Sequence, residues 1–236
     1  MASEPLSGSP AAGNRVRVFV DYWNLALAMK DRDEQFTFDW EQLPMWLAST
    51  GTATCGRDEA SYEGAHVYAS YNPLSASDSK FKNWMLGWLD RQPGVQISLK
   101  ERRRRDPPKC PNCYKTAAQC PSCGSCLAGT QEKGVDTAIV TDMIRLAWEH
   151  AYDIAVLVTS DSDFVPAVEF LDSRGLKIDN LGPALEQLST EPPSLPGKAL
   201  APGRESPKPP ELHGLLLDLA DELPDHVGVI GGVGAV

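Results

Sequence analysis

Four aspartates of this sequence stand where apolar segments give way to polar ones or where a predicted helix begins. They are Asp21, Asp136, Asp161 and Asp163. Carboxylates that converge repel one another unless a proton or a cation neutralises them. Oxygen ligands without nearby His or Cys favour a hard cation such as Mg²⁺ or Mn²⁺. The pattern therefore predicts a divalent-metal site, and such an ion can activate water and stabilise the displaced oxygen of a phosphodiester.

Each aspartate taken alone has a second interpretation as a helix N-cap, a role for which Asp is favoured. The combination favours the metal site, because three separate segments must coincide. Asn24 follows Asp21 by about one helical turn. Asp142 follows Asp136 by six residues, about 240° around a helix. Helix geometry therefore leaves Asp142 at most a possible outer-shell role.

The elements that must position these residues alternate between strand and helix. Alternating or continuous apolar runs predict strands over 15–20, 65–70, 95–100, 154–159 and 176–180. Apolar residues at a spacing of three to four predict helices over 23–30, 40–48, 77–90, 135–150 and 163–173, with a loop over 49–60. This order predicts an α/β protein with a three-layer α/β/α, Rossmann-like architecture and a parallel central sheet. Ligands of such sheets bind at the carboxyl ends of the strands.

The chain is expected to divide into four parts. Residues 1–14 are expected to be disordered, 15–183 to form the α/β domain, 184–210 to be a proline-rich linker and 211–236 to be an acidic tail. Within the tail, the spacing of the apolar residues predicts a short amphipathic helix over 211–223, which docks on the domain or on a protein partner. Its apolar residues are Leu212, Leu215, Leu216 and Leu219. The oligomeric state is left open.

Most of the cysteines are clustered between positions 110 and 126, where two C-P-x-C pairs and one overlapping pair occur. Clustered pairs of this type commonly hold one tetrahedral Zn²⁺, so the sequence predicts a zinc ribbon inserted over 106–130. The zinc ligands would be Cys110, Cys113 and Cys120, with either Cys123 or Cys126 as the fourth. Cys55 stands apart and is expected to be a surface or loop thiol.

A basic run leads into this insert and consists of Arg102, Arg103, Arg104 and Arg105. The chain has a formal net charge of −10, which argues against nonspecific adhesion to nucleic acid. Against that background the run predicts contacts with the phosphates of a nucleic acid, although basic runs are also common on solvated faces. Two interpretations of the insert stay open: zinc only folds it, or the insert grips the substrate.

Aromatic residues offer a second possible contact with a nucleic acid. Trp84 and Trp88 lie on the apolar face of a predicted helix and are expected in the core. Tyr22 and Trp23 follow Asp21 directly, so they either pack in the core or flank a cleft in which bases stack on them. The four histidines lie outside the acidic segments, and no Ser/His or Cys/His pair is needed for the predicted chemistry.

Three sequence blocks carry a resemblance to a known family. They are V-F-V-D-Y-W-N-L at 18–25, E-K-G-V-D-T-A-I-V-T-D-M at 132–143 and V-L-V-T-S-D-S-D-F-V-P at 156–166. In order and spacing these blocks resemble the NYN domain family, nearest to its LabA-like branch, within the PIN-like nuclease superfamily. The resemblance implies a PIN-like fold and metal-dependent ribonuclease activity, with RNA as the partner.

Residue by residue, the resemblance implies that Asp21, Asp136, Asp161 and Asp163 bind the metal. It also implies that Asn24 orients the substrate or a water on the metal. Asp142 matches the family's second helix aspartate, which conflicts with its direction on the helix. The inserted cysteine ribbon departs from the simplest form of the family, so the resemblance implies no role for it.

Two other functions are compatible with parts of the pattern. A non-catalytic regulator that binds RNA or protein could retain the same fold. Asp161-Ser-Asp163 also has the D-x-D form of haloacid dehalogenase phosphatases, but that motif belongs after the first strand. Residues 1–14 lack the apolar core of a secretory leader, and no apolar run approaches the roughly 20 residues of a membrane span. The protein is therefore expected to be soluble and cytoplasmic, without a membrane partner.

Overall fold

The computed structural model describes residues 14–31, 37–124, 127 and 129–181. The predictions for the N-terminal residues 1–13, the linker 184–210 and the tail 211–236 lie outside the described residues, and so does Cys126. The chain separates into two compact units. The described part of the first is the α/β domain, and that of the second is an arm over Arg103–Gln131.

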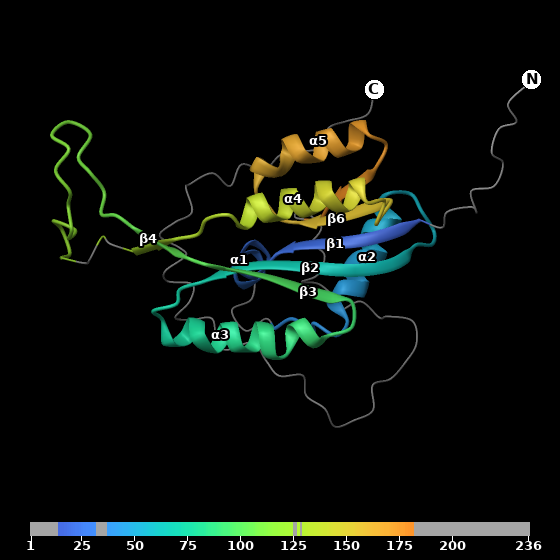
Figure 1. Cartoon of the computed structure of the whole chain (residues 1–236), viewed down its shortest axis with the longest axis horizontal. Helices are drawn as coiled ribbons and strands as arrows, with labels where there is room; N and C mark the ends of the chain where they lie inside the picture. Colours follow the sequence, from blue (N-terminus) through green and yellow to red (C-terminus); the bar gives the residue numbers. More distant parts are fainter. Residues whose placement is uncertain (1–13, 32–36, 125–126, 128, 182–236) are drawn as a thin grey trace, which may run out of the picture. The chain divides into compact units, whose positions relative to one another are not determined.

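The α/β domain is built on a five-stranded sheet with the strand order β3-β2-β1-β6-β7. All neighbouring strands are parallel, which confirms the predicted fold class (Figure 1). The strands are β1 (Arg15–Asp21), β2 (Ser61–Tyr71), β3 (Val95–Glu101), β6 (Ile154–Val158) and β7 (Lys177–Asn180). Every residue of β6 is buried, as expected for a parallel strand covered on both faces.

Helices cover both faces of this sheet. They are α1 (Tyr22–Lys30), α2 (Leu43–Thr54), α3 (Ala76–Gly87), α4 (Val135–Trp148) and α5 (Val165–Ser173), with 3-10 turns at Leu89–Arg91 and Ser162–Phe164. The helices α4 and α5 lie on one face, and α2 and α3 lie on the other (Figure 1). The result is the predicted three-layer α/β/α arrangement. No described helix is long and apolar enough to cross a membrane.

The largest error of the sequence prediction concerns α2. This helix was predicted over 40–48, followed by a loop over 49–60, but it runs from Leu43 to Thr54. Asp39 forms a turn before the helix by accepting a hydrogen bond from Leu43 N at 2.8 Å. Gly51 lies inside the helix because α2 crosses β6 closely there: a Cβ on Gly51 would lie 2.4 Å from Cγ2 of Val156. A glycine that permits close packing was thus interpreted as a loop residue.

The other predicted elements are confirmed with smaller shifts at their ends. The second strand begins at Ser61 rather than 65, and the third helix ends at Gly87 rather than 90. The fourth helix ends at Trp148, where His150 adopts a positive φ of 51° and redirects the chain. These differences arise at element ends, where local pattern carries the least information.

The arm over Arg103–Gln131 contains two strands that the sequence analysis did not predict. Strand β4 (Arg103–Arg105) pairs antiparallel with β5 (Gly129–Gln131). The register places Arg103 opposite Gln131. The two ends of the insert are therefore joined by a short ladder that encloses the cysteine-containing residues.

Candidate active site

The acidic segments meet where the strand order reverses. From β1 the chain adds β2 and β3 on one side of the sheet and β6 and β7 on the other. The point between β1 and β6 is therefore a topological switch point, where parallel sheets bind ligands outside the carboxyl ends of the strands. Asp21 ends β1, and Asp161 follows β6. The two aspartates consequently flank the switch point.

Asp21 is a buried carboxyl, with 4% of its surface exposed. It caps α1 by accepting hydrogen bonds from Asn24 N at 3.2 Å and from Asn24 Nδ2 at 3.4 Å. Burial and, to a smaller extent, the negative charges of Glu132 and Asp136 raise the pKa of Asp21 to about 7, although the hydrogen bonds from Asn24 lower it. Asp21 therefore serves both as the N-cap of α1 and as a member of the acidic site.

Asn24 connects this carboxyl to the end of β6. While its Nδ2 donates to Asp21, its Oδ1 accepts hydrogen bonds from Ser160 N at 3.1 Å and from Ser160 Oγ. Both ends of the amide thus contact protein groups. The amide of Asn24 holds the ends of β1 and β6 in register across the switch point.

The other aspartates come from α4 and from the segment after β6. Asp136 lies in the first turn of α4, and burial and the charges of Asp161 and Asp163 raise its pKa. Asp161 caps the following 3-10 turn by accepting a hydrogen bond from Asp163 N at 2.9 Å. Asp136 therefore lies close enough to the other three predicted aspartates for electrostatic interaction: Asp161 and Asp163 act on its carboxyl, and its own charge acts on Asp21.

A fifth carboxylate belongs to this group, and the sequence analysis missed it. Glu132 contributes to the raised pKa of Asp21, and it accepts a hydrogen bond from Ser70 Oγ at the carboxyl end of β2. Its position was readable as part of the E-K-G-V-D block. The sequence could not predict the contact of Glu132 with Ser70, because the two residues are far apart in the chain.

The donor set consists of carboxylate oxygens, which suits a hard divalent cation. The raised pKa of Asp21 fits as well, because a cation would relieve the repulsion that opposes its ionisation. However, within the ranges that the structure describes, no three His, Cys, Asp or Glu side chains are gathered closely enough to hold one ion. The carboxylates are close enough to repel one another electrostatically, but those described do not form a complete ligand shell.

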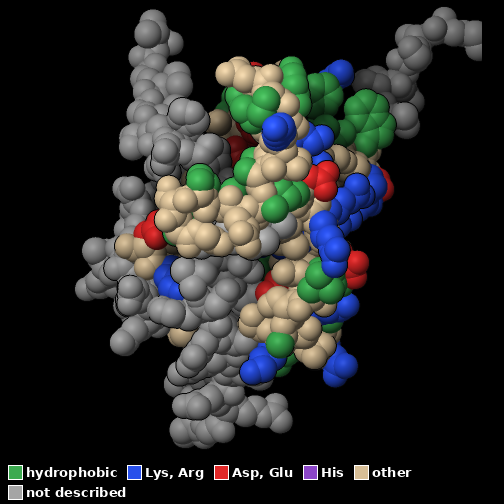
Figure 2. Space-filling view, turned by 90° about the vertical axis from the view of Figure 1, so that its left-hand side faces the viewer, with side chains coloured by type: hydrophobic (Ala, Val, Ile, Leu, Met, Phe, Trp, Pro, Cys, Tyr) green, Lys and Arg blue, Asp and Glu red, His purple; other side chains and the backbone are tan. Residues whose placement is uncertain are grey.

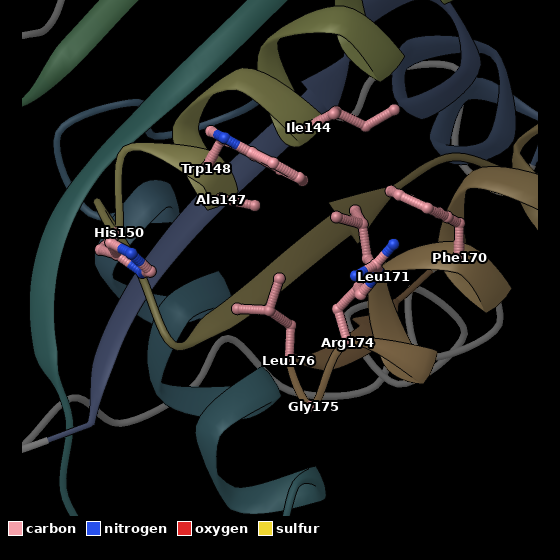
Figure 3. Close-up of a pocket in the computed structure, with 9 residues that line it drawn as sticks. All are labelled: Ile144, Ala147, Trp148, His150, Phe170, Leu171, Arg174, Gly175 and Leu176. Carbon is pink, nitrogen blue, oxygen red and sulfur yellow. The ribbon is translucent and has the colours of Figure 1, made fainter.

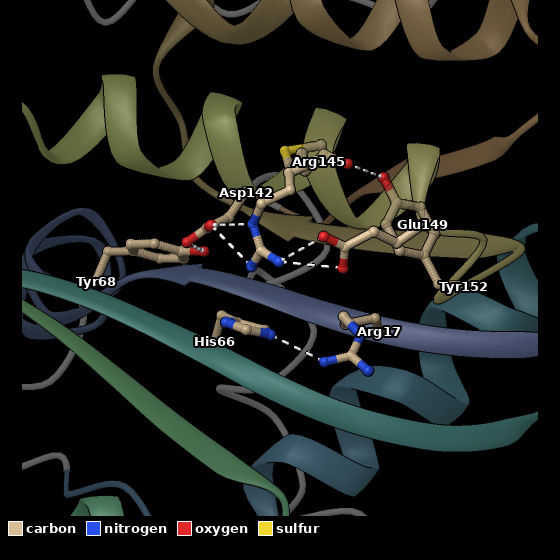
Figure 4. A network of polar contacts seen from close by, with 8 residues as sticks. Arg17, His66, Tyr68, Asp142, Arg145, Glu149 and Tyr152 are labelled. Carbon is tan, nitrogen blue, oxygen red and sulfur yellow. Dashed lines mark hydrogen bonds and ion pairs between the residues drawn. The ribbon is translucent and has the colours of Figure 1, made fainter.

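The side chain of Asp142 on α4 points toward Tyr68 and Arg145 (Figure 4). Its Oδ2 accepts a hydrogen bond from Tyr68 Oη at 2.9 Å, and its Oδ1 pairs with Arg145 Nη2 at 3.1 Å. Arg145 also pairs with Glu149 at 3.0 Å. Nearby, burial and the charge of Arg17 lower the pKa of His66 to about 4. Asp142 thus contributes to a polar network between α4 and the sheet.

Tyr22 and Trp23 do not flank a cleft. Both are buried, with 0% and 4% of their surfaces exposed. They pack against Phe81 with ring centroids 5.0 Å and 4.8 Å away, and Trp23 Nε1 donates to Ser70 O at 2.8 Å. The structure therefore overturns their interpretation as base-stacking residues. Trp84 is buried in the same aromatic cluster, as predicted. Trp88, which was also predicted in the core, is only half-buried and stacks on Trp84 with ring centroids 5.6 Å apart.

The four arginines of the basic run have two different environments. Arg102 is buried, with 6% of its surface exposed, and its N donates to Tyr71 O at 2.8 Å. Arg103, Arg104 and Arg105 form β4 and are exposed. Lys and Arg side chains are likewise visible at the surface in the space-filling view, despite the negative net charge of the chain (Figure 2). Of the predicted run, β4 supplies the arginines available to a phosphate.

The two C-P-x-C pairs of the arm adopt the same local conformation. Tyr114 N donates to Cys110 O at 2.8 Å, and Gly124 N donates to Cys120 O at 2.8 Å. Tyr114 and Gly124 both have positive φ angles, of 58° and 74°. The N–H groups of Cys113 and Asn112 lower the pKa of the Cys110 thiol, which favours the thiolate that zinc binds.

A groove on the outer surface of the domain lies away from this site. Its volume is about 350 Å³, and it lies between α4 and α5 (Figure 3). Trp148, Phe170 and Leu176 give it an apolar lining, and no carboxylate lines it. The groove adjoins the last turn of α4, whereas Asp136 lies in the first turn. It therefore has neither the chemistry nor the location of the acidic site.

The acidic switch point on a parallel α/β sheet is the arrangement expected of a nuclease-like domain. Residues 15–194 match the NYN domain, so this chain belongs to the NYN domain family. NYN domains are part of the PIN-like nuclease superfamily. The family places the chain among nuclease-like proteins.

Two proteins similar to this chain are themselves uncharacterised. The uncharacterized protein y4oD of Sinorhizobium fredii (strain NBRC 101917 / NGR234) is 40% identical over 52 residues, which cover 22% of this chain and 24% of that protein. The match thus spans about a quarter of that relative. A crystal structure of VPA0982, a protein of unknown function from Vibrio parahaemolyticus RIMD 2210633, is 18% identical and covers 73% of this chain and 83% of that chain, with a TM-score of 0.42.

Proposed function

We propose that this protein is a metal-dependent ribonuclease of the LabA-like branch that hydrolyses phosphodiester bonds of RNA. The observation that carries the proposal is the state of Asp21. This carboxyl is buried at the switch point, and two other acidic side chains oppose its ionisation. A divalent cation at this edge of the sheet would turn that unfavourable arrangement into a binding site.

In this proposal Mg²⁺ or Mn²⁺ is held by Asp21, Asp136, Asp161 and Asp163. The cation would supply charge stabilisation for the displaced oxygen and would activate water for attack on phosphorus. Asn24 acts as a positioning residue, because its amide joins Asp21 to Ser160. Asp142 is left out of the ligand set, since its carboxylate contacts Tyr68 and Arg145.

The arm has two proposed roles of its own. Cys110, Cys113, Cys120 and either Cys123 or Cys126 hold a structural Zn²⁺, which the matching conformations of the two C-P-x-C turns support. The exposed arginines of β4 contact RNA phosphates. Thiolate zinc sites suit a reducing compartment, so the cytoplasm is the proposed location.

The test is cleavage of single-stranded and structured RNAs with Mn²⁺ or Mg²⁺, in wild type and in Asp21→Asn and Asp161→Asn variants. Loss of at least about a hundredfold in kcat is expected for both. Asp172→Asn, an exposed aspartate of α5, is the matched control and should retain full activity. Cleavage that persists in both site variants would overturn the proposal.

A second function is a non-catalytic regulator that binds RNA or protein through the same fold. The absence of three ready-placed metal ligands among the described residues favours it. The two functions predict different results in the same assay. The regulator binds RNA without turnover at any divalent metal, and Asp161→Asn leaves its RNA affinity unchanged.

A further inference from the structure

The end of β2 holds both ends of the inserted arm. Tyr71 O accepts a hydrogen bond from Arg102 N at 2.8 Å, where the chain leaves for the arm. Ser70 Oγ donates to Glu132, where the chain returns. Ser70 and Tyr71 are neighbours, so two adjacent residues of one strand fix the entry and the exit of the insert.

Ser70 is itself held firmly. It is fully buried, and its carbonyl oxygen accepts a hydrogen bond from Trp23 Nε1 at 2.8 Å. Trp23 packs against Phe81 with ring centroids 4.8 Å apart. The hydroxyl that meets Glu132 therefore rests on the aromatic core between the sheet and α3, and a buried hydroxyl without its partner would cost free energy.

Glu132 is consequently directed to the acidic edge of the sheet. β2 pairs with β1 so that Tyr68 lies opposite Asp21, which places Ser70 just beyond the end of β1. Trp23, which follows Asp21 by two residues, donates to the carbonyl oxygen of the same Ser70 at 2.8 Å, so the contact between Ser70 and Glu132 lies near Asp21. The insert thus returns to the domain through a carboxylate located beside the buried aspartate.

We propose that Glu132 is a further ligand of the divalent cation, on the side of Asp21, and that Ser70 is the residue that positions it. This inference rests on the proposed ribonuclease function and extends its ligand set.

Binding of Mn²⁺ to the full chain provides a test that does not depend on catalysis. Mn²⁺ affinity is measured by electron paramagnetic resonance of the free ion and by the rise of Tm on titration. Glu132→Gln should weaken Mn²⁺ binding at least about tenfold and should reduce the rise of Tm on titration with Mn²⁺ accordingly. Glu169→Gln, an exposed glutamate of α5, should change neither quantity.

The positioning role of Ser70 is tested by a double-mutant cycle. Ser70→Ala should weaken Mn²⁺ binding by about threefold to tenfold, and adding it to Glu132→Gln should cause no further loss, because the two residues act through one contact. Ser98→Ala on β3 is the matched control. Additive effects of Ser70→Ala and Glu132→Gln, or wild-type affinity in Glu132→Gln, would overturn the inference.

Asp161→Asn, measured beside these variants, separates the two proposals. An inactive Asp161→Asn protein together with a fully active Glu132→Gln protein of unchanged Mn²⁺ affinity contradicts the role of Glu132 alone. An Asp161→Asn protein that still cleaves RNA contradicts the ribonuclease site as a whole.

Discussion

Asn24 and Ser160 connect the carboxyl ends of β1 and β6, with Ser160 N donating to Asn24 Oδ1 at 3.1 Å. The same Asn24 amide donates to Asp21. One side chain therefore determines the spacing between the strand that ends in Asp21 and the segment that carries Asp161. An acidic site at a switch point requires such a link, because the two strands contribute their carboxylates from different parts of the chain.

Asn24→Ala should lower kcat for RNA cleavage by about a hundredfold, because small displacements of site residues have effects of that size. The free energy of unfolding should fall by roughly 1–2 kcal/mol from the lost hydrogen bonds. Steady-state kinetics and denaturant titration measure the two effects. Asn83→Ala, an exposed residue of α3, should leave both unchanged. Full activity in Asn24→Ala would show that the link has no role in the reaction.

Asp21→Asn should have opposite effects with and without metal. The pKa of Asp21 is raised from 3.8 to about 7 in the fold, so metal-free stability should fall as pH rises from about 4 to 7. The variant lacks this titration and should be more stable than wild type at pH 8. Mn²⁺ at about 100 times its Kd should add about 2.7 kcal/mol to wild type and nothing to the variant. Thermal melts of both proteins at pH 5 and pH 8, with and without Mn²⁺, measure these differences in stability. The prediction is contradicted by an Asp21→Asn protein that is less stable than wild type at pH 8 without metal.

Gly51→Ala should destabilise the domain, although alanine usually favours a helix interior. The added Cβ would lie 2.4 Å from Cγ2 of Val156, and overpacking of this kind costs about 1–3 kcal/mol. Gly87→Ala is the matched control, because a Cβ at Gly87 in α3 would meet nothing within 4 Å. Val156→Ala removes the methyl groups with which the added Cβ would clash. Gly51→Ala should therefore lower the free energy of unfolding less in a Val156→Ala protein than in wild type. Denaturant unfolding measures all four proteins.

Zinc should be present at about one ion per chain. Cys110→Ser should abolish it, while Cys55→Ser, which alters a half-buried thiol at the end of α2, should not. Comparing Cys123→Ser with Cys126→Ser identifies the fourth ligand as the position whose loss reduces zinc content. Metal analysis of purified protein gives the result directly. Wild-type zinc content in Cys110→Ser would exclude the ribbon.

Replacing Arg103, Arg104 and Arg105 together by alanine should weaken RNA binding about equally for different sequences. The slope of log affinity against log salt should become less steep by about two, near 0.7 per lost phosphate contact on single strands. The matched control is an equal change of charge elsewhere on the surface, at Arg57, Lys80 and Arg91. Fluorescence anisotropy over a salt series measures the slope. An unchanged slope would mean that β4 does not contact phosphate.

Much of the fold could be predicted because its elements have strong local patterns. The continuous apolar run of β6 and the 3–4 spacing of α4 gave both elements correctly to within two residues. Where local pattern and packing disagree, the prediction was wrong. Gly51 has the composition of a loop, but the contact of α2 with Val156 decides its state.

The sequence by itself determined which residues carry acidic groups and at which strand end they stand, because period and composition are local properties. Only the tertiary structure decided which groups face one another. It brought Ser70 to Glu132 and Asn24 to Ser160, buried Tyr22 and Trp23 in the core, and directed Asp142 to Tyr68. These relationships depend on strand order and register, which join residues far apart in the chain and leave no local pattern.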